Sequence, residues 1–238
     1  MASSSTQPKP FIRPFQPPDK DNAVHIFRET ADPSVQIEPI STIGSHIWCL
    51  PYLTLSLSNC FVVDNGSGKA VGYCIGASDT EDFARRWQAE FLPTLEQDLR
   101  TLPLPDDVSE EEKLQLRKRR DELCDGIYSN PRGLVFAEFA EQLGDYPGHL
   151  HIDILPSHQR LGLGKKLVDA LLGSLRDAGC KGVYLGMVAG NYGAARFYER
   201  EGFYRLPQVL DEGASGEKGR TKGDRAGFGG VIYYVKDL

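Results

Sequence analysis

The amino-acid sequence predicts an α/β (α+β) fold, a mixed central sheet flanked by helices, and three segments carry that prediction. Residues 60–76 contain two β-rich runs around Asn65-Gly66, the pattern of an antiparallel hairpin. Residues 149–200 run strand, helix, strand, helix, which implies a parallel pair of strands with a helical crossover. Between these segments the apolar residues recur with a helical period. We therefore expect a helical insertion at about residues 78–130, before the strand that begins at residue 149.

Length and composition favour one domain. The chain has 238 residues, of which 40% are hydrophobic, enough for one packed core. Residues 1–10 are polar and proline-rich, so we expect a flexible tail there and a single domain over residues 11–238. Residues 11–15 read as a short edge strand, because Pro14 has no N–H to donate to a central ladder.

Helices are expected both before the hairpin and inside the insertion. Residues 21–27 have an apolar stripe that should end at the Asp-Pro pair of residues 32–33, and the first part of residues 42–57 is helix-like. In the insertion, two serines each stand three residues before a glutamate, which is a reciprocal capping pattern. These pairs, Ser78 with Glu81 and Ser109 with Glu112, predict helices at about residues 79–92 and 110–124.

The C-terminal region should return to the sheet. Residues 211–230 are rich in glycine and charge and lack periodicity, which predicts a long loop between residues 204–206 and a strand at residues 231–235. That hydrophobic strand could complete the sheet of its own chain or exchange with a second copy. The sequence therefore leaves open whether the protein forms a homodimer.

Charge and cysteine content narrow the class of protein. A net charge of −6 argues against broad nucleic-acid binding, and the basic run at residues 117–120 follows three glutamates on one expected helix, which favours a solvated helix face. The five cysteines include no Cys-x-x-Cys pair, so we expect reduced thiols. No segment approaches the about 18 apolar residues that span a bilayer, and residues 1–15 lack the apolar core of a signal peptide. We expect a cytoplasmic or nuclear protein without a membrane partner.

A glycine-bearing turn joins the strand at residues 149–155 to a long amphipathic helix. A helix start has backbone N–H groups without intrahelical partners and a positive dipole end, so it attracts anions. Gly162 and Gly164 allow a phosphate to approach the backbone. From the Gly-x-Gly pattern alone, this segment could also be a simple strand-to-helix turn that binds no ligand.

Two familiar phosphate motifs are excluded by residue identity. A Walker loop needs serine or threonine after Gly-Lys, but Lys166 follows Lys165, and no glycine stands five residues before Gly164. A dinucleotide fingerprint needs a third glycine three residues after the second, and Leu167 occupies that position.

A second pattern follows one strand later, and it reads Asn191-x-x-Ala194-x-x-Phe197-Tyr198-x-x-x-Gly202-Phe203. Together with the glycine turn it resembles the acetyl-CoA-binding core of the GNAT superfamily of N-acetyltransferases, over about 55 residues. The order of hairpin, helical insertion and His-x-Asp strand further resembles the acetyltransferase-like domain found beside O-GlcNAc-removing glycosidases and in stand-alone microbial relatives. The resemblance implies a GNAT-like fold.

The resemblance also implies acetyl-CoA as co-substrate, with its pyrophosphate on the turn amides and its pantetheine arm beside the strand. It assigns cofactor contacts to Ile154, Leu155, Gln159, Arg160, Leu161, Gly162, Leu163, Gly164, Lys165 and Asn191. The side chains of Lys165 and Lys166 could add charge near phosphate or belong to an ordinary solvated first turn.

Two residues are candidates for catalysis. Tyr198 resembles the family's proton source for the departing thiolate, with a core aromatic as the alternative. Asp153 interrupts an apolar strand, so it is either a catalytic or substrate-binding carboxylate or a structural partner of His151. We expect no metal, because His149 and His151 share a strand face while His158 belongs to the turn, and we expect satisfied polar side chains instead.

The implied activity is direct transfer of an acetyl group to a primary amine of a small molecule or peptide. A non-catalytic acetyl-CoA-binding or protein-interaction module is the alternative, since fold and cofactor do not establish an acceptor. Five aromatic residues of the first half of the chain could line the wall of the acceptor site, although Phe83, Trp87 and Phe91, at four-residue spacing, could instead form a packed helix face. They are Trp48, Tyr52, Phe83, Trp87 and Phe91.

Overall fold

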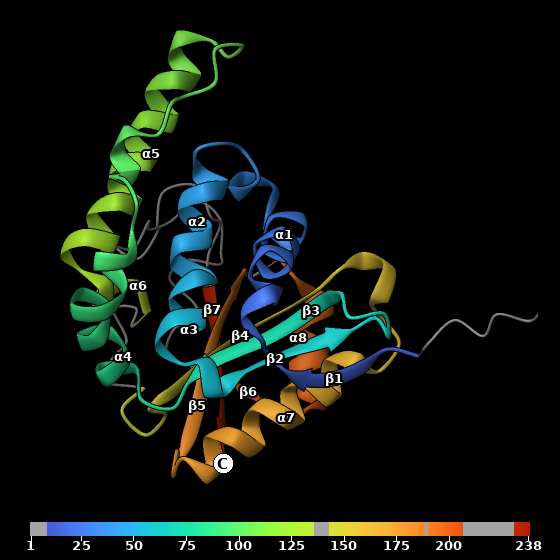
Figure 1. Ribbon diagram of the computed structural model, residues 1–238. Helices are drawn as coiled ribbons and strands as arrows, with labels where there is room; N and C mark the ends of the chain where they lie inside the picture. Colours follow the sequence, from blue (N-terminus) through green and yellow to red (C-terminus); the bar gives the residue numbers. More distant parts are fainter. Residues whose placement is uncertain (1–8, 136–142, 189, 207–230) are drawn as a thin grey trace, which may run out of the picture.

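The computed structural model describes residues 9–135, 143–188, 190–206 and 231–238, and in this part of the chain seven strands form one mixed sheet (Figure 1). The strand order is β1-β2-β3-β4-β5-β7-β6. All neighbours are antiparallel except β4 and β5, which are parallel. The strands are β1 (Phe11–Pro14), β2 (Cys60–Asp64), β3 (Ala70–Ala77), β4 (Gly148–Ile154), β5 (Gly182–Val188), β6 (Tyr204–Arg205) and β7 (Val231–Asp237).

Helices cover both faces of this sheet. One face packs against α1 (Lys20–Thr30), α2 (Ile40–Trp48) and α3 (Leu50–Leu55), and the opposite face packs against α7 (Leu163–Asp177) and α8 (Tyr192–Arg200) (Figure 1). Each side has its own apolar cluster, as expected for a sheet buried between two helical layers.

Several predictions about strands and helices are confirmed. The edge strand at Phe11, the hairpin of β2 and β3, and the parallel pair of β4 and β5 all form. Within the helix-like region, Cys49 has φ −135° and separates α2 from α3, and Pro51 lies in the first turn of α3, where its missing N–H costs nothing. Strand β7 completes the sheet of its own chain, between β5 and β6.

The insertion differs from the prediction in two places. The first expected helix, at residues 79–92, is a short helix α4 (Thr80–Arg86) that continues as a π-helical turn over Trp87–Phe91. Its N-cap is Asp79, whose side chain accepts from the backbone N–H of Asp82, so the expected cap at Ser78 is wrong. Asp79 competes successfully because a carboxylate also complements the positive helix end.

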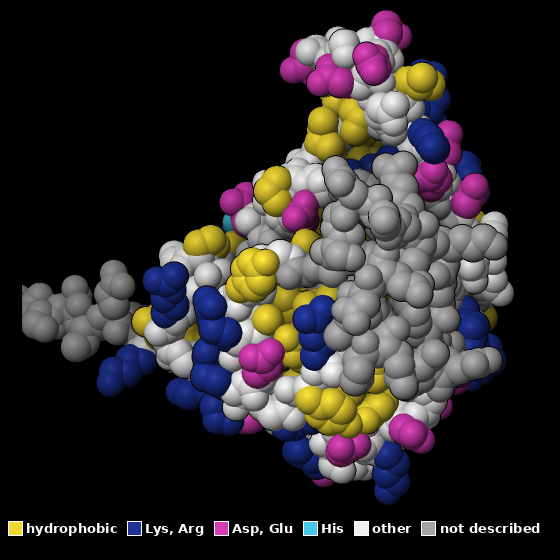
Figure 2. All heavy atoms as spheres, turned by 180° about the vertical axis from the view of Figure 1, so that it is seen from behind, with side chains coloured by type: hydrophobic (Ala, Val, Ile, Leu, Met, Phe, Trp, Pro, Cys, Tyr) yellow, Lys and Arg dark blue, Asp and Glu magenta, His cyan; other side chains and the backbone are white. Residues whose placement is uncertain are grey.

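The second insertion helix has the predicted start. Ser109 and Glu112 form the reciprocal capping box at the beginning of α5 (Glu110–Ser129), which α6 (Pro131–Val135) follows. The lower part of α5 packs on α2, and its first turns extend away from the sheet (Figure 1). Acidic side chains gather on that projecting end (Figure 2), where residues 106–107 and 110–112 are exposed.

The basic run on α5 is only partly solvated. Arg117 and Lys118 are exposed, but Arg119 and Arg120 are half-buried, and Arg120 donates to the carbonyl of Leu102 at 3.2 Å. Arg120 therefore stabilises the insertion itself, because a long arginine side chain can bury its stem while its guanidinium finds an acceptor.

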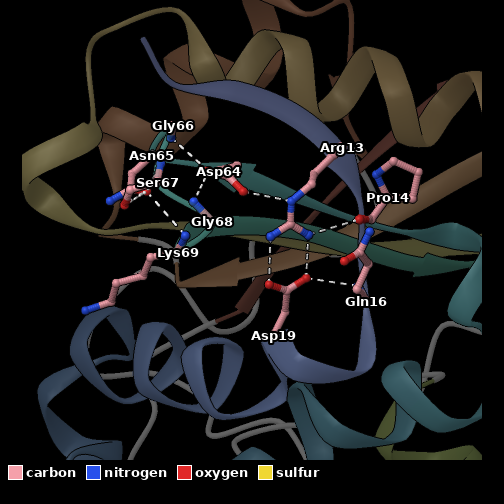
Figure 3. Close-up of polar contacts among 10 residues, drawn as sticks. All are labelled: Arg13, Pro14, Gln16, Asp19, Asp64, Asn65, Gly66, Ser67, Gly68 and Lys69. Atoms are coloured by element: carbon pink, nitrogen blue, oxygen red, sulfur yellow. Dashed lines mark hydrogen bonds and ion pairs between the residues drawn. The ribbon is translucent and has the colours of Figure 1, made fainter. Parts of the chain in front are cut away.

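An ion cluster fastens the sheet edge to the start of α1 and to the hairpin turn (Figure 3). Arg13 donates to both carboxylate oxygens of Asp19, at 2.6 and 2.9 Å, and to Asp64 at 2.9 Å. The other oxygen of Asp64 accepts the N–H groups of Gly66 and Gly68, which shapes the turn. The side chains of Arg13, Asp19 and Asp64 are 17%, 4% and 4% exposed, so this is a nearly buried cluster.

Some expectations concern residues that the structure does not describe, whereas those about the cysteines and about membrane-spanning helices can be compared with it. Most of the expected tail, residues 1–8, and the expected loop at residues 211–230 lie outside the described residues. All five cysteines are described, and all are free and buried, as predicted for reduced thiols. No helix within the described ranges is long and apolar enough to cross a bilayer.

Candidate functional site

The parallel strands β4 and β5 pair only at their beginnings and then separate. Their ladder contains Gly148 with Val183 and His149 with Tyr184, and no further pair forms in the described strands. In an antiparallel ladder, alternate residues turn their main-chain groups toward opposite neighbours. Leu155 donates its N–H to Val71 at 3.0 Å, toward β3, so Ile154 and Ile152 turn theirs toward β5. The opening, which we call the wedge, therefore has an unpaired strand edge along β4.

The main-chain groups of Leu155, a predicted cofactor contact, already have partners within the chain. Leu155 has its N–H bonded to Val71 and its carbonyl bonded to the N–H of His158 at 2.8 Å, so it does not offer a free strand edge. Ile154 does face the wedge, and its carbonyl accepts from the side-chain amide of Gln159 at 2.8 Å. Ile152, which we had not predicted, faces the wedge as well. The register between β3 and β4 decides which residues of β4 turn their main-chain groups toward the wedge, and the sequence of β4 alone does not reveal that register.

The turn before α7 exposes a set of backbone N–H groups. Arg160 and Gly162 both adopt left-handed conformations, with φ 61° and 73°. Among the described residues, no acceptor is found for the N–H groups of residues 160–162. Helix α7 begins at Leu163, so the N–H groups of residues 163–165 also lack intrahelical partners. These amides and the positive end of a 15-residue helix can bind an anion.

Gly164 brings α7 and α8 close together. A Cβ atom at this position would lie 3.2 Å from both Cε2 and Cζ of Phe197, and 3.8 Å from Cδ1 of Ile154. This glycine therefore serves helix packing beside the turn. Gly162, in contrast, has open space around it and is needed for its left-handed backbone.

Two predicted cofactor side chains already have partners within the chain. Lys165 Nζ lies 3.0 Å from Asp169 and 3.3 Å from Glu201, and these exposed ion pairs raise its pKa. The Asn191 side-chain oxygen caps α8 by accepting from the N–H of Ala194 at 3.0 Å. The Asn191 amide nitrogen has no partner in the described chain and lies beside the wedge end of β5. Contacts of either side chain with a cofactor stay predictions.

Tyr198 reaches the wedge region from α8. It is 8% exposed, and its ring packs against Phe197, Phe203 and Tyr234 at centroid distances of 5.3, 5.7 and 6.0 Å. Its hydroxyl has no hydrogen-bond partner among the residues that the structure describes. Burial raises the pKa of Tyr198 well above its usual range, and the nearby charge of Asp153 raises it further. The phenol therefore keeps its proton at neutral pH.

Asp153 is held by a residue that the sequence analysis missed. Tyr73, its register partner on β3, donates its hydroxyl to Oδ2 of Asp153 at 2.5 Å. The expected alternative, a pair with His151, is wrong. Burial raises the pKa of Asp153, and the hydrogen bond from Tyr73 offsets part of that change. A carboxylate with a raised pKa is a better proton acceptor than an ordinary one.

The two strand histidines were predicted to be satisfied polar side chains, and this holds for both ring nitrogens of His149 but only for Nε2 of His151. Nδ1 of His149 contacts the Thr80 hydroxyl at 2.7 Å, and its Nε2 contacts the Tyr52 hydroxyl at 2.8 Å. Nε2 of His151 contacts the same Tyr52 hydroxyl at 3.0 Å. The described residues contain no group of three or more histidine, cysteine, aspartate or glutamate side chains that could hold a metal ion.

Candidate groups reach the wedge from opposite faces of the sheet. Alternation along β4 places His149, His151 and Asp153 on the face covered by α1 to α3, whereas Tyr198 packs with the cluster under α7 and α8. The charge of Asp153 adds to the effect of burial in raising the pKa of Tyr198. A carboxyl group and a phenol thus lie on opposite faces of the sheet, and their roles in proton transfer stay predictions.

The five aromatic residues that were candidates for an acceptor wall are packed inside the protein. Tyr52, Phe83, Trp87 and Phe91 are each at most 2% exposed, and they pack ring against ring in the core. Trp48 is half-buried and stacks on Phe27. The packed helix face, and not the acceptor wall, is the correct interpretation.

Comparison with known proteins agrees with this geometry. The model of the family described as "Acetyltransferase (GNAT) family" matches residues 24–203. The crystal structure of SsHAT is similar, with a TM-score of 0.67 and 28% identity over 97% of this chain and 98% of that chain. The crystal structure of PH1933 from Pyrococcus horikoshii OT3 shares the fold, with a TM-score of 0.50 and 15% identity over 97% and 99% of the two chains. The expected fold is confirmed.

Two curated relatives are much longer proteins. Protein O-GlcNAcase of Rattus norvegicus and of Mus musculus are each 26% identical to this chain over 203 residues, which cover 83% of this chain and 20% of the relative. The chain thus spans about one fifth of the length of these relatives.

Proposed function

The chain belongs to the acetyltransferase (GNAT) family, and from that premise we propose that it transfers the acetyl group of acetyl-CoA directly to a primary amine. The observation that carries this proposal is the wedge between β4 and β5, which opens beside the amides of residues 160–165 and between Asp153 and Tyr198. The acceptor is a small-molecule amine or a peptide amine.

The residues of the wedge fit acetyl-CoA. The turn amides match the pyrophosphate, because they combine N–H donors with the positive end of α7. The unpaired edge offers the N–H groups of Ile152 and Ile154 and the carbonyl of Ile152 to the amides of the pantetheine arm, whereas the carbonyl of Ile154 already accepts from Gln159. When bound, acetyl-CoA supplies an acetyl group activated as a thioester.

The chemistry then needs two proton transfers by this chain. Attack on the acetyl carbon requires a neutral amine, and the Asp153 carboxylate receives the proton that the amine loses, with Tyr73 keeping the carboxylate oriented. The C–N bond forms as the C–S bond breaks. The proton on the Tyr198 hydroxyl is available for the departing sulfur, since its raised pKa keeps the phenol protonated.

Calorimetry with acetyl-CoA and a screen of acceptors test the proposal in sequence. We expect acetyl-CoA to bind, and we expect free CoA to be released with at least one class among polyamines, amino sugars, amino acids and histone peptides. No binding at millimolar acetyl-CoA would exclude both the enzyme and any acetyl-CoA-binding module. Binding without CoA release from any amine would favour the non-catalytic module.

A further inference from the structure

Four side chains and one carbonyl form a continuous chain of hydrogen bonds beside the wedge. Pro147 contributes its carbonyl, Thr80 and Tyr52 their hydroxyls, and His149 and His151 their rings. The successive distances are 2.7 Å from Pro147 to Thr80, 2.7 Å to His149, 2.8 Å to Tyr52 and 3.0 Å to His151. Because each hydroxyl has one proton, these contacts determine which ring nitrogen of each histidine carries hydrogen.

The order of protons follows from the carbonyl end. A carbonyl only accepts, so the Thr80 hydroxyl donates to Pro147, and the oxygen of Thr80 must accept from Nδ1–H of His149. Burial lowers the pKa of His149 to about 3, so its Nε2 is unprotonated and accepts from the Tyr52 hydroxyl. The Tyr52 oxygen then accepts from Nε2–H of His151.

His151 is consequently left with a lone pair on Nδ1. Burial lowers the pKa of His151 to about 4, so the ring carries a single proton at neutral pH, the one directed at Tyr52. No hydrogen-bond partner for Nδ1 occurs in the described part of the chain, and His151 is only half-buried. A fixed imidazole with one available acceptor nitrogen can recognise an N–H group.

The neighbouring strand has an exposed glycine on the same face. If the ladder of His149 with Tyr184 is continued across the wedge, His151 comes opposite Gly186. Gly186 is exposed, although most of β5 is buried, and its register partner Tyr233 leans over it, with ring atom Cε1 3.2 Å from the position of a Cβ. His151 thus borders a part of the wedge where the backbone of β5 is exposed, two residues from Asp153.

We propose that His151 is a substrate-binding residue whose Nδ1 accepts a hydrogen bond from the acceptor amine, and that Tyr52 positions it by fixing its tautomer. The role as an amine site rests on the proposed function, whereas the tautomer does not. His151 orients the amine on the α1 to α3 face of the wedge, and Asp153 receives its proton.

Histidine side-chain nitrogen NMR on the full chain tests the tautomers without any substrate. The chain has five histidines, so resonances can be assigned with single variants. We expect Nδ1–H for His149 and Nε2–H for His151. Tyr52→Phe keeps the ring that stacks on Phe83 but removes the hydroxyl, so the His151 tautomer should become mixed. A wild-type His151 that is charged, or protonated on Nδ1, would overturn the proposal.

Two substitutions of His151 separate amine binding from structure. Asn places its amide group at the position of Nδ1, whereas Gln places it near Nε2, where it can still donate to Tyr52. With the best amine from the acceptor screen, His151→Gln should raise the acceptor KM about 5- to 10-fold, the loss of one hydrogen bond, and His151→Asn should raise it less. The Kd of acetyl-CoA should stay unchanged in both variants.

The control is His25→Gln on the exposed side of α1, which should change neither constant. Tyr52→Phe should raise the acceptor KM like His151→Gln, and it should also lower the melting temperature, because the buried Nε2 of His149 loses its donor. If the wild-type enzyme is active and His151→Gln has the same acceptor KM, the role of His151 is refuted but the proposed function is not. A chain that releases no CoA with any amine refutes the proposed function instead, and the amine site with it.

Discussion

Replacing Tyr198 by phenylalanine should slow acetyl transfer while leaving the fold at least as stable as before. The hydroxyl has no hydrogen-bond partner among the described residues, and the ring alone makes the packing contacts with Phe197, Phe203 and Tyr234. Removing the oxygen therefore breaks no bond within this part of the chain. We expect the free energy of unfolding to stay the same or rise by up to about 1 kcal/mol. For a chain of this size the melting temperature would rise by at most about 2–4 °C.

The effect on turnover follows from the leaving group. A general acid contributes roughly 10²- to 10⁴-fold, and a thiolate leaves more readily than an amine or alkoxide because thiols have pKa values of about 8.5. We therefore expect kcat to fall about 100-fold in Tyr198→Phe. The Kd of acetyl-CoA should change by less than about twofold, since the turn amides and the β4 edge are untouched.

The assays are CoA release under saturating acetyl-CoA, calorimetry for the Kd and thermal unfolding. Tyr128→Phe on α5 is the matched control, because it should lower the stability of the fold and leave turnover unchanged. Its hydroxyl accepts from the N–H of Leu99 at 2.9 Å, so its loss should destabilise the fold by about 1 kcal/mol and leave kcat unchanged. An unchanged kcat in Tyr198→Phe would refute the role as proton source, and a clear loss of stability would refute the account of the hydroxyl.

Three further changes test the turn, the base and the ion cluster. Gly164→Ala should weaken acetyl-CoA binding, because its Cβ would lie 3.2 Å from the Phe197 ring. Gly173→Ala on the same helix is the control: its Cβ meets no atom, so it should stabilise α7 by about 1 kcal/mol. The same acetyl-CoA affinity and melting temperature in both variants would contradict this prediction. Burial raises the pKa of Asp153 in the folded chain, so protonation of this carboxyl favours the folded state. That contribution to stability is complete below the unfolded pKa of about 3.9 and is lost as the pH rises through the folded pKa. Asp153→Asn should remove that dependence and the acid limb of the pH–rate profile, and an unaltered profile would exclude Asp153 as base. Arg13→Met should cost about 3 kcal/mol by leaving two nearly buried carboxylates without their cation. The lowered pKa values of those carboxylates contribute stability above about pH 3.9 that disappears as pH falls through the folded values, so the melting difference from wild type should shrink in acid.

Much of the fold could be predicted because its signals are local. The capping box of Ser109 and Glu112 joins residues three apart, and the hairpin of β2 and β3 joins runs separated by five residues. The error at α4 has a local cause as well, since Ser78 and Asp79 are adjacent candidates for one cap. The π-helical turn at Trp87 was not predictable, because packing in the core decides how those residues wind.

The candidate site was predictable only in part. Tyr198, Asp153 and the glycine turn could be named from motifs, but the residues that hold them could not. Tyr73 is 80 residues from Asp153, and Tyr52 is 99 residues from His151. Such contacts depend on strand register and on which helix covers which face, and neither leaves a periodic trace in the sequence.

By itself, the sequence determined the segment from residue 149 to residue 203 as strand, anion-binding turn, helix, strand and helix, because glycine conformations, helix starts and apolar periods act over a few residues. Only the tertiary structure decided that β4 and β5 separate after two residue pairs, that Ile152 and Ile154 rather than Leu155 face the opening, and that Asp153 is held by Tyr73. The physical reason is that main-chain direction and side-chain partners in a sheet are set by neighbouring strands, which here come from distant parts of the chain.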